Sequence, residues 1–192
     1  MKTKFVLPLF VGILGFLPLS YFVAQSPIAQ SQVAPTKFET YILPDRYVNG
    51  SLPKFSIQYP AGWFIDEQWL VGGNYLNITN YPTPTGYQLA KVGDVKTEIY
   101  FQVGSFEQAW QGRPSWRGRV KVFRKGKLLI DGKEAIRIWE GGDGSEGYFE
   151  SILTYVKLNS NKYFQIVSYS NKLTPTEIDT IQRMHWSFRI LE

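Results

Sequence analysis

The stretch Phe55–Trp63, FSIQYPAGW, decides the fold of this chain. Its first five residues alternate apolar and polar side chains, which predicts a β-strand with one buried face. Pro60 cannot donate a hydrogen bond to a sheet ladder and therefore ends the strand, and Gly62 and Trp63 follow in a turn. A strand of this kind is stable only in a larger sheet with a covered face.

Further segments carry the same period-two pattern. The strongest are residues 96–104 (KTEIYFQVG), 147–158 (GYFESILTYVKL) and 162–170 (KYFQIVSYS). The last two are apolar on both faces, so we predict that they lie in the middle of the sheet and are covered on both sides. Asp131-Gly132, between apolar segments, predicts a hairpin with a two-residue turn.

One long helix is predicted near the C-terminus. Residues 174–177 (TPTE) form a capping box with proline at the first helical position. Ile178, Ile181, His185 and Phe188 then recur at helical spacing, which predicts a stripe packed against the sheet. A shorter helix is expected after Ser105, and SFRI at 187–190 is expected to return as a strand. These elements predict an α+β fold, mainly an antiparallel β-sheet flanked by helices.

This order of motifs resembles the PsbP family, which shares an α/β/α sandwich with the Ran-binding Mog proteins. The matching positions, all architectural, are Tyr59, Pro60, Gly62, Trp63, Tyr148, Glu150, Tyr155, Tyr163, Ser187 and Phe188. The resemblance covers about residues 55–190. It implies an extrinsic protein on the lumenal or periplasmic side of a membrane, where PsbP itself docks on photosystem II. The chain departs from the photosystem-associated version because it lacks a lipidation cysteine and has a single histidine.

The N-terminus indicates export. Lys2 and Lys4 precede a long apolar block that is followed by small and polar residues, so residues 1–31 are interpreted as an export signal, with a retained N-terminal anchor as the alternative. Residues 32–54 are rich in Gln, Ser, Pro and Ala and are predicted to be a flexible linker. Residues 55–192 are then a single globular domain, located in the periplasm or thylakoid lumen.

Basic residues concentrate in one segment that contains no acidic residue. Its seven members are Arg113, Arg117, Arg119, Lys121, Arg124, Lys125 and Lys127. If residues 117–122 form a strand, Arg117, Arg119 and Lys121 share one exposed face, which would suit an anionic partner. A solvated strand face is the alternative interpretation. The chain without its export signal has 19 basic and 16 acidic residues, a charge of +3, which does not indicate a nucleic-acid-binding protein.

The sequence contains little that could carry catalysis or hold a metal. There is no cysteine, and the one histidine, His185, lies on the apolar helical stripe, where a core position explains it best. The acidic loop with Glu140, Asp143 and Glu146 does not match a calcium-loop pattern and is interpreted as a hairpin connection. We therefore expect no catalytic residue, no metal site and no cofactor.

These observations favour an exported, non-enzymatic binding or scaffolding protein. We expect it to be a monomer that docks by its seven basic residues on a membrane-associated protein complex or another anionic surface. The alternative is a small-ligand or glycan-binding domain that uses exposed aromatic side chains, of which Trp69, Trp110, Trp116 and Trp139 are the candidates. A hydrolase that uses His185 is the weakest hypothesis, since it would need a nucleophile and an acid beside the ring.

Overall fold

The structure is a computed structural model. It describes residues 37–48, 52–67, 70, 75–82, 89–111, 121–141 and 147–191. The chain divides into two compact units, residues 1–34 and 35–192, and all described residues belong to the second. The predicted export signal therefore lies outside the described residues. Within them, no helix is both long enough and apolar enough to cross a bilayer.

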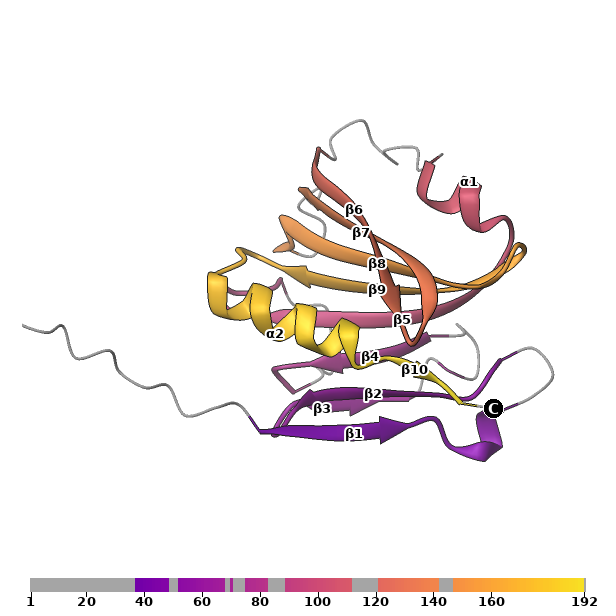
Figure 1. Cartoon of the computed structure of the whole chain (residues 1–192). Helices are drawn as coiled ribbons and strands as arrows, with labels where there is room; N and C mark the ends of the chain where they lie inside the picture. The colour runs from indigo at the N-terminus through magenta and orange to yellow at the C-terminus, as the bar shows by residue number, and fades with distance from the viewer. Residues whose placement is uncertain are drawn as a thin grey trace, which may run out of the picture. The chain divides into compact units, whose positions relative to one another are not determined.

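A seven-stranded antiparallel sheet forms the larger part of the described unit (Figure 1). In spatial order its strands are β3 (Phe64–Asp66), β4 (Tyr75–Thr79), β5 (Val95–Val103), β9 (Lys162–Ser170), β8 (Glu150–Asn159), β7 (Lys133–Gly141) and β6 (Val122–Ile130). The two strands that are apolar on both faces, β8 and β9, lie inside this sheet as predicted. Strand β6 forms one edge.

A second, three-stranded sheet has the order β1 (Phe38–Ile42), β2 (Phe55–Pro60) and β10 (Arg189–Ile190). Strand β2 is the predicted strand of the FSIQYPAGW motif, and SFRI returns beside it as β10. The prediction of a flexible linker over 32–54 is wrong for residues 38–47, which form a strand and a short helix. Strand β1 pairs with β2 from Phe38↔Pro60 to Ile42↔Ser56, and a short 3-10 helix, η1 (Asp45–Tyr47), follows it.

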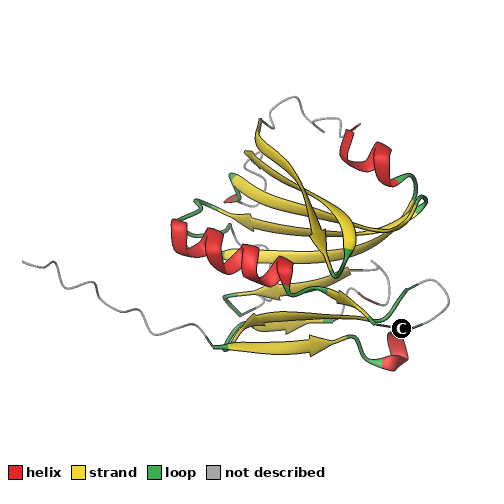
Figure 2. Ribbon diagram, in the orientation of Figure 1, coloured by secondary structure: helices red, strands yellow, loops and turns green. Residues whose placement is uncertain are grey.

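The two α-helices lie on opposite faces of the large sheet (Figure 2). Helix α2 (Pro175–Trp186) starts with the predicted capping box and buries Ile181, Met184 and His185. Helix α1 (Phe106–Gln111) packs through Phe106 on the other face, beside side chains of β7, β8 and β9. This layering confirms the predicted α+β sandwich.

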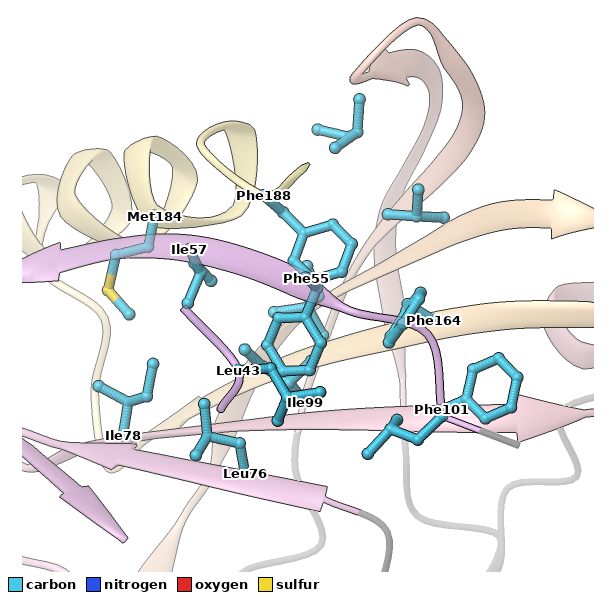
Figure 3. Close-up of a cluster of buried hydrophobic side chains, with 14 of the residues drawn as sticks. Leu43, Phe55, Ile57, Leu76, Ile78, Ile99, Phe101, Phe164, Met184 and Phe188 are labelled. Carbon is cyan, nitrogen blue, oxygen red and sulfur yellow. The ribbon is translucent and has the colours of Figure 1, made fainter. Parts of the chain in front are cut away.

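The main core lies between the large sheet and the small sheet, on the side of α2. Figure 3 shows Phe55 and Ile57 of β2 facing Ile99, Phe101 and Phe164 of the large sheet. Met184 of α2 and Phe188 close the cluster, and the rings of Phe55 and Phe188 lie 5.4 Å apart. One face of the large sheet is therefore covered jointly by a helix and by a second sheet.

The predicted β6–β7 hairpin turns at Asp131 (φ 53°) and Gly132 (φ 69°). Two successive positive φ angles characterise the type I′ turn, whose twist matches that of the flanking strands. The Asp131 carboxylate also accepts a hydrogen bond from the backbone N–H of Ile190 at 3.0 Å. The turn of the large sheet is thereby connected to β10 of the small sheet.

Candidate functional site

Four of the seven predicted partner-binding residues are described, and they gather on strand β6. Lys121 immediately precedes the strand, and Arg124, Lys125 and Lys127 belong to it; all four are exposed. Arg113, Arg117 and Arg119 lie outside the described residues, so the predicted alignment of Arg117, Arg119 and Lys121 on one strand face stays a prediction.

The β6 cations point to both faces of the sheet, because neighbouring residues of a strand alternate. Arg124 lies over the ring of Trp139, 4.6 Å from its centroid, on the face that α2 covers. Lys125 lies over the ring of Trp110 in α1, at 3.7 Å, on the opposite face. The strand therefore carries basic groups along its edge and not as a ridge on a single face. Each cation–π contact contributes about 0.5–1 kcal/mol and holds its side chain in place.

Exposed apolar side chains accompany these cations. Val122, Phe123 and Leu129 are 54%, 61% and 68% exposed. The cations on β6 form no ion pair with any described carboxylate. We call these seven residues, Lys121, Val122, Phe123, Arg124, Lys125, Lys127 and Leu129, the β6 surface. The apolar part of this surface was not predicted from the sequence, although the adjacent pair Val122-Phe123 in a basic segment is a signal that could have revealed it.

The outer edge of β6 is unpaired among the described residues. The strand forms its ladder with β7 alone, and a register irregularity separates Val122 from Arg124. An edge strand exposes backbone N–H and C=O groups to which a further strand can bind, and lysine together with a bulge is the common protection against self-association. Two copies of β6 would place cations against cations, so the edge disfavours its own copy and favours an acidic partner.

A buried polar network lies beneath α2, and its centre is His185. Its members are Arg137, Thr154, Ser168, Thr97 and His185, all buried. The imidazole Nδ1 lies 2.8 Å from Thr154 Oγ1, and Nε2 lies 2.9 Å from Ser168 Oγ. Arg137 Nε donates to Thr154 Oγ1 at 3.0 Å, and Ser168 Oγ lies 2.6 Å from Thr97 Oγ1.

The guanidinium sets the direction of this hydrogen-bond chain. Arg137 can only donate, so Thr154 Oγ1 accepts from it and keeps its own proton, which it can donate to Nδ1 of His185. In the neutral tautomer that accepts this proton at Nδ1, Nε2 carries the ring proton and donates to Ser168 Oγ. Burial, reinforced by the nearby Arg137 charge, holds the pKa of His185 well below its usual range. The helix C-terminus does not offset this burial.

The His185–Ser168 pair has the distance of a base and a nucleophile, but its surroundings do not suit catalysis. Both residues are fully buried, so a substrate cannot reach Ser168 Oγ. The other imidazole nitrogen contacts a hydroxyl that is bound to a guanidinium, whereas catalytic histidines are oriented by a carboxylate or an amide. The pair is better explained as a structural link between α2 and the sheet.

The two described candidates for glycan stacking do not present a free ring. Trp110 and Trp139 are half-buried, and a cation lies over each of them. Trp69 and Trp116 lie outside the described residues. The exposed tryptophan among the described residues is Trp186, the last residue of α2, which is 52% exposed. Trp186 was not among the tryptophans predicted from the sequence to stack on a glycan.

The acidic loop is described only at its start. The Glu140 side chain is buried and accepts a hydrogen bond from Ser151 Oγ at 3.4 Å, while Asp143 and Glu146 lie outside the described residues. Among the described residues, no group of three or more histidine or acidic side chains is arranged to hold a metal ion.

Comparison with known proteins identifies similar folds but no relative of similar sequence. No protein-family model matches the chain, and no curated protein matches it. Among solved structures, the Ran-binding protein Mog1p of Saccharomyces cerevisiae is 12% identical, with 81% of this chain and 96% of that chain covered and a TM-score of 0.50. LpqN of Mycobacterium tuberculosis, a protein involved in cell envelope biogenesis, is 11% identical, with 82% and 93% covered and a TM-score of 0.51.

A third similar structure is the cyanobacterial PsbP, CyanoP, of Synechocystis, with 8% identity, 86% of this chain and 100% of that chain covered and a TM-score of 0.49. At these identities, similarity concerns the path of the backbone and not the side chains of a site. The similarity to Mog1p over most of both chains shows that this protein has the PsbP/Mog-type fold that its motifs predicted.

Proposed function

We propose that this chain is an exported, non-enzymatic binding protein that docks through the β6 surface on an acidic face of a membrane-associated protein complex. The observation that carries the proposal is the composition of β6, whose outer edge pairs with no described strand. Four exposed cations, none in an ion pair with a described carboxylate, share this edge with three exposed apolar side chains. Charge complementarity determines which partner is recognised and how fast it associates, and apolar contacts contribute to the affinity.

A protein partner fits this surface better than a lipid bilayer does. A basic side chain at an anionic membrane contributes about 1 kcal/mol, so the four described cations would contribute about 4 kcal/mol, which corresponds to a dissociation constant of about 1 mM. Arg124 and Lys125 are also held against aromatic rings. Side chains fixed in this way lose little entropy on meeting acidic groups at fixed positions, as a folded partner presents them.

Two further considerations support a binding role in an exported compartment. Mog1p, which has this fold, is a Ran-binding protein, and LpqN is involved in cell envelope biogenesis. The N-terminal 31 residues have the pattern of an export signal or anchor, which leads to the periplasm or the thylakoid lumen. Photosystem II on its lumenal side is the complex that the resemblance to PsbP implies.

Charge reversal on the β6 surface tests the proposal. The triple variant Lys121→Glu, Lys125→Glu, Lys127→Glu should lose membrane association at low salt by a factor on the order of ten or more, because attraction becomes repulsion. The measurement is a crosslinked pull-down from native membranes at low and high salt, with recovery of the partner quantified. High salt should weaken binding of the unmodified chain as well.

The matched control reverses three exposed lysines elsewhere, namely Lys37→Glu, Lys91→Glu, Lys172→Glu. It changes the net charge by the same amount and should retain the association. Equal binding by the β6 variant and the unmodified chain would remove the β6 surface from consideration. Equal losses in both variants would show that net charge alone matters, and salt-sensitive binding to protein-free vesicles of anionic lipid would favour a bilayer as the partner.

A further inference from the structure

Arg137 of β7 is a buried cation that pairs with no described carboxylate. The residue is 2% exposed, and within the described part of the chain it forms no ion pair. Its Nε donates to Thr154, but its Nη2 is buried without a hydrogen-bond partner. An unmade hydrogen bond of this kind costs about 1–3 kcal/mol and more for a charged group, so the position calls for a physical reason.

Space is open over Gly126, on the strand next to Arg137. Gly126 of β6 is the cross-strand partner of Arg137 and lies on the same face of the sheet. No atom lies within 4 Å of the position that a Cβ at Gly126 would occupy, and the backbone there does not have a positive φ. The backbone conformation therefore does not require glycine. Glycine inside a strand weakens it and often marks a place where a ligand approaches closely.

Trp186 covers the guanidinium from the solvent side. The Arg137 Cζ lies 5.0 Å from the indole centroid, and the tryptophan is half-exposed at the end of α2. The neighbouring helical residues Ile181, Met184 and His185 anchor α2 in the core. Helix α2 is therefore fixed by its buried residues, while the indole at its end borders solvent.

We propose that Arg137, Gly126 and Trp186 form a binding site for a carboxylate. The anion enters over Gly126 as the indole of Trp186 swings aside, and it accepts a hydrogen bond from Nη2 of Arg137. Arg124, two residues from Gly126 on the same strand face, supplies a second positive charge at the approach. This inference goes beyond docking by the β6 surface, because the site needs no macromolecular partner.

The chemistry of the site favours a monoanion. A single guanidinium is neutralised by one negative charge, whereas a dianion would retain an uncompensated charge in a buried position. A carboxylate is planar, as the guanidinium is, and the two groups pair in one plane. Burial lowers the pKa of Arg137 to about 10, so the guanidinium remains charged at neutral pH.

The test is the melting temperature of the purified full chain at pH 7 in acetate and in chloride of equal ionic strength. Acetate should raise Tm by about 3 °C when its concentration reaches ten times its dissociation constant. Arg137→Met should abolish this shift, and its Tm in chloride should equal or exceed that of the unmodified chain, because a buried unpaired charge is removed. The matched control is Arg183→Met, which removes an exposed arginine stacked on Phe38 and should keep the shift.

Two further variants keep the proposal falsifiable if Arg137→Met does not fold. Gly126→Val fills the open space and should abolish the acetate shift. Binding of acetate should also change the tryptophan fluorescence, because the indole of Trp186 moves. Trp186→Phe should keep the Tm shift and lose this fluorescence change.

A triglutamate peptide is the second probe, and it presents its carboxylates on a peptide chain. A Tm shift with acetate or with the peptide supports the site, and the comparison shows whether the site prefers a free carboxylate or one on a chain. No shift with either probe, or an unchanged shift in Arg137→Met or Gly126→Val, would overturn the proposal, as would a shift with inorganic phosphate alone.

Discussion

At the scale of single residues, the most informative side chain is His185. It is the one histidine of the chain, and it is fully buried with both ring nitrogens in hydrogen bonds to hydroxyl groups. Protonation would leave a buried imidazolium close to the Arg137 charge, so burial and this charge both hold the pKa of His185 well below its usual range. The histidine is thus a neutral structural group whose charging opposes folding.

This arrangement predicts a pH dependence of stability. The pKa of His185 is depressed in the folded state, so the unfolded state binds the proton more tightly, and the contribution of His185 is present above about pH 6.5 and lost as the pH falls below it. The loss should approach about 1.4 kcal/mol per pH unit. The measurement is the free energy of unfolding in urea at several pH values between 7 and 5, for the unmodified chain and for His185→Gln. The free energy of the unmodified chain should fall more steeply with decreasing pH than that of the variant. Parallel curves would show that His185 does not titrate on unfolding in this range.

At the scale of elements, the β6–β7 hairpin connects the candidate site with the rest of the fold. The conformation of its turn is specified by the local sequence Asp131-Gly132. The position of the turn is fixed by contacts with residues far away in the sequence. The Asp131 carboxylate accepts from the N–H of Ile190 and lies 3.6 Å from the guanidinium of Arg189. The end of the chain therefore holds the turn of the strand that carries the basic edge.

The hairpin contains two glycines that should respond differently to substitution. Gly132 has a positive φ of 69°, so Gly132→Ala forces a side chain into the left-handed region and should destabilise the fold by about 1–2 kcal/mol. Gly126 has no positive φ and open space, so Gly126→Ala should be neutral or stabilising by about 0.5–1 kcal/mol. Chemical denaturation of the two variants measures the difference. Equal effects would contradict the type I′ turn.

At the scale of the whole described unit, two sheets share one core, and the segment before β2 contributes to it. Leu43 follows β1 and is fully buried, among Phe55, Ile57 and the side chains of the large sheet. Its backbone N–H also donates to the carbonyl of Phe55 at 2.9 Å. The N-terminal part of the unit is therefore structural, and the small sheet depends on it.

Removal of the Leu43 side chain should be costly if this is correct. Leu43→Ala should reduce the free energy of unfolding by about 2–5 kcal/mol, the usual range for a buried leucine. Val48→Ala, at an exposed position in the same segment, should change it by less than about 0.5 kcal/mol. Guanidinium unfolding compares the two. A small effect of Leu43→Ala would restore the interpretation of this segment as a linker.

The sequence by itself determined the parts of the fold that depend on local patterns. The strand of FSIQYPAGW, the Asp131-Gly132 turn and the capping box at Thr174 each have a short-range signature, because alternation, positive φ and helix capping are properties of neighbouring residues. The doubly apolar strands β8 and β9 were likewise recognisable as central. Together these features were sufficient for the fold class.

Only the tertiary structure decided which residues meet. FETYI at Phe38–Ile42 has no strong strand pattern of its own and becomes a strand because β2 pairs with it. The basic residues of β6 were visible in the sequence, but their division between two faces and their stacking on Trp110 and Trp139 follow from the position of the strand at the sheet edge. Arg137 and His185 lie 48 residues apart in the chain and share Thr154 because sheet register and helix packing, which are long-range properties, bring them together.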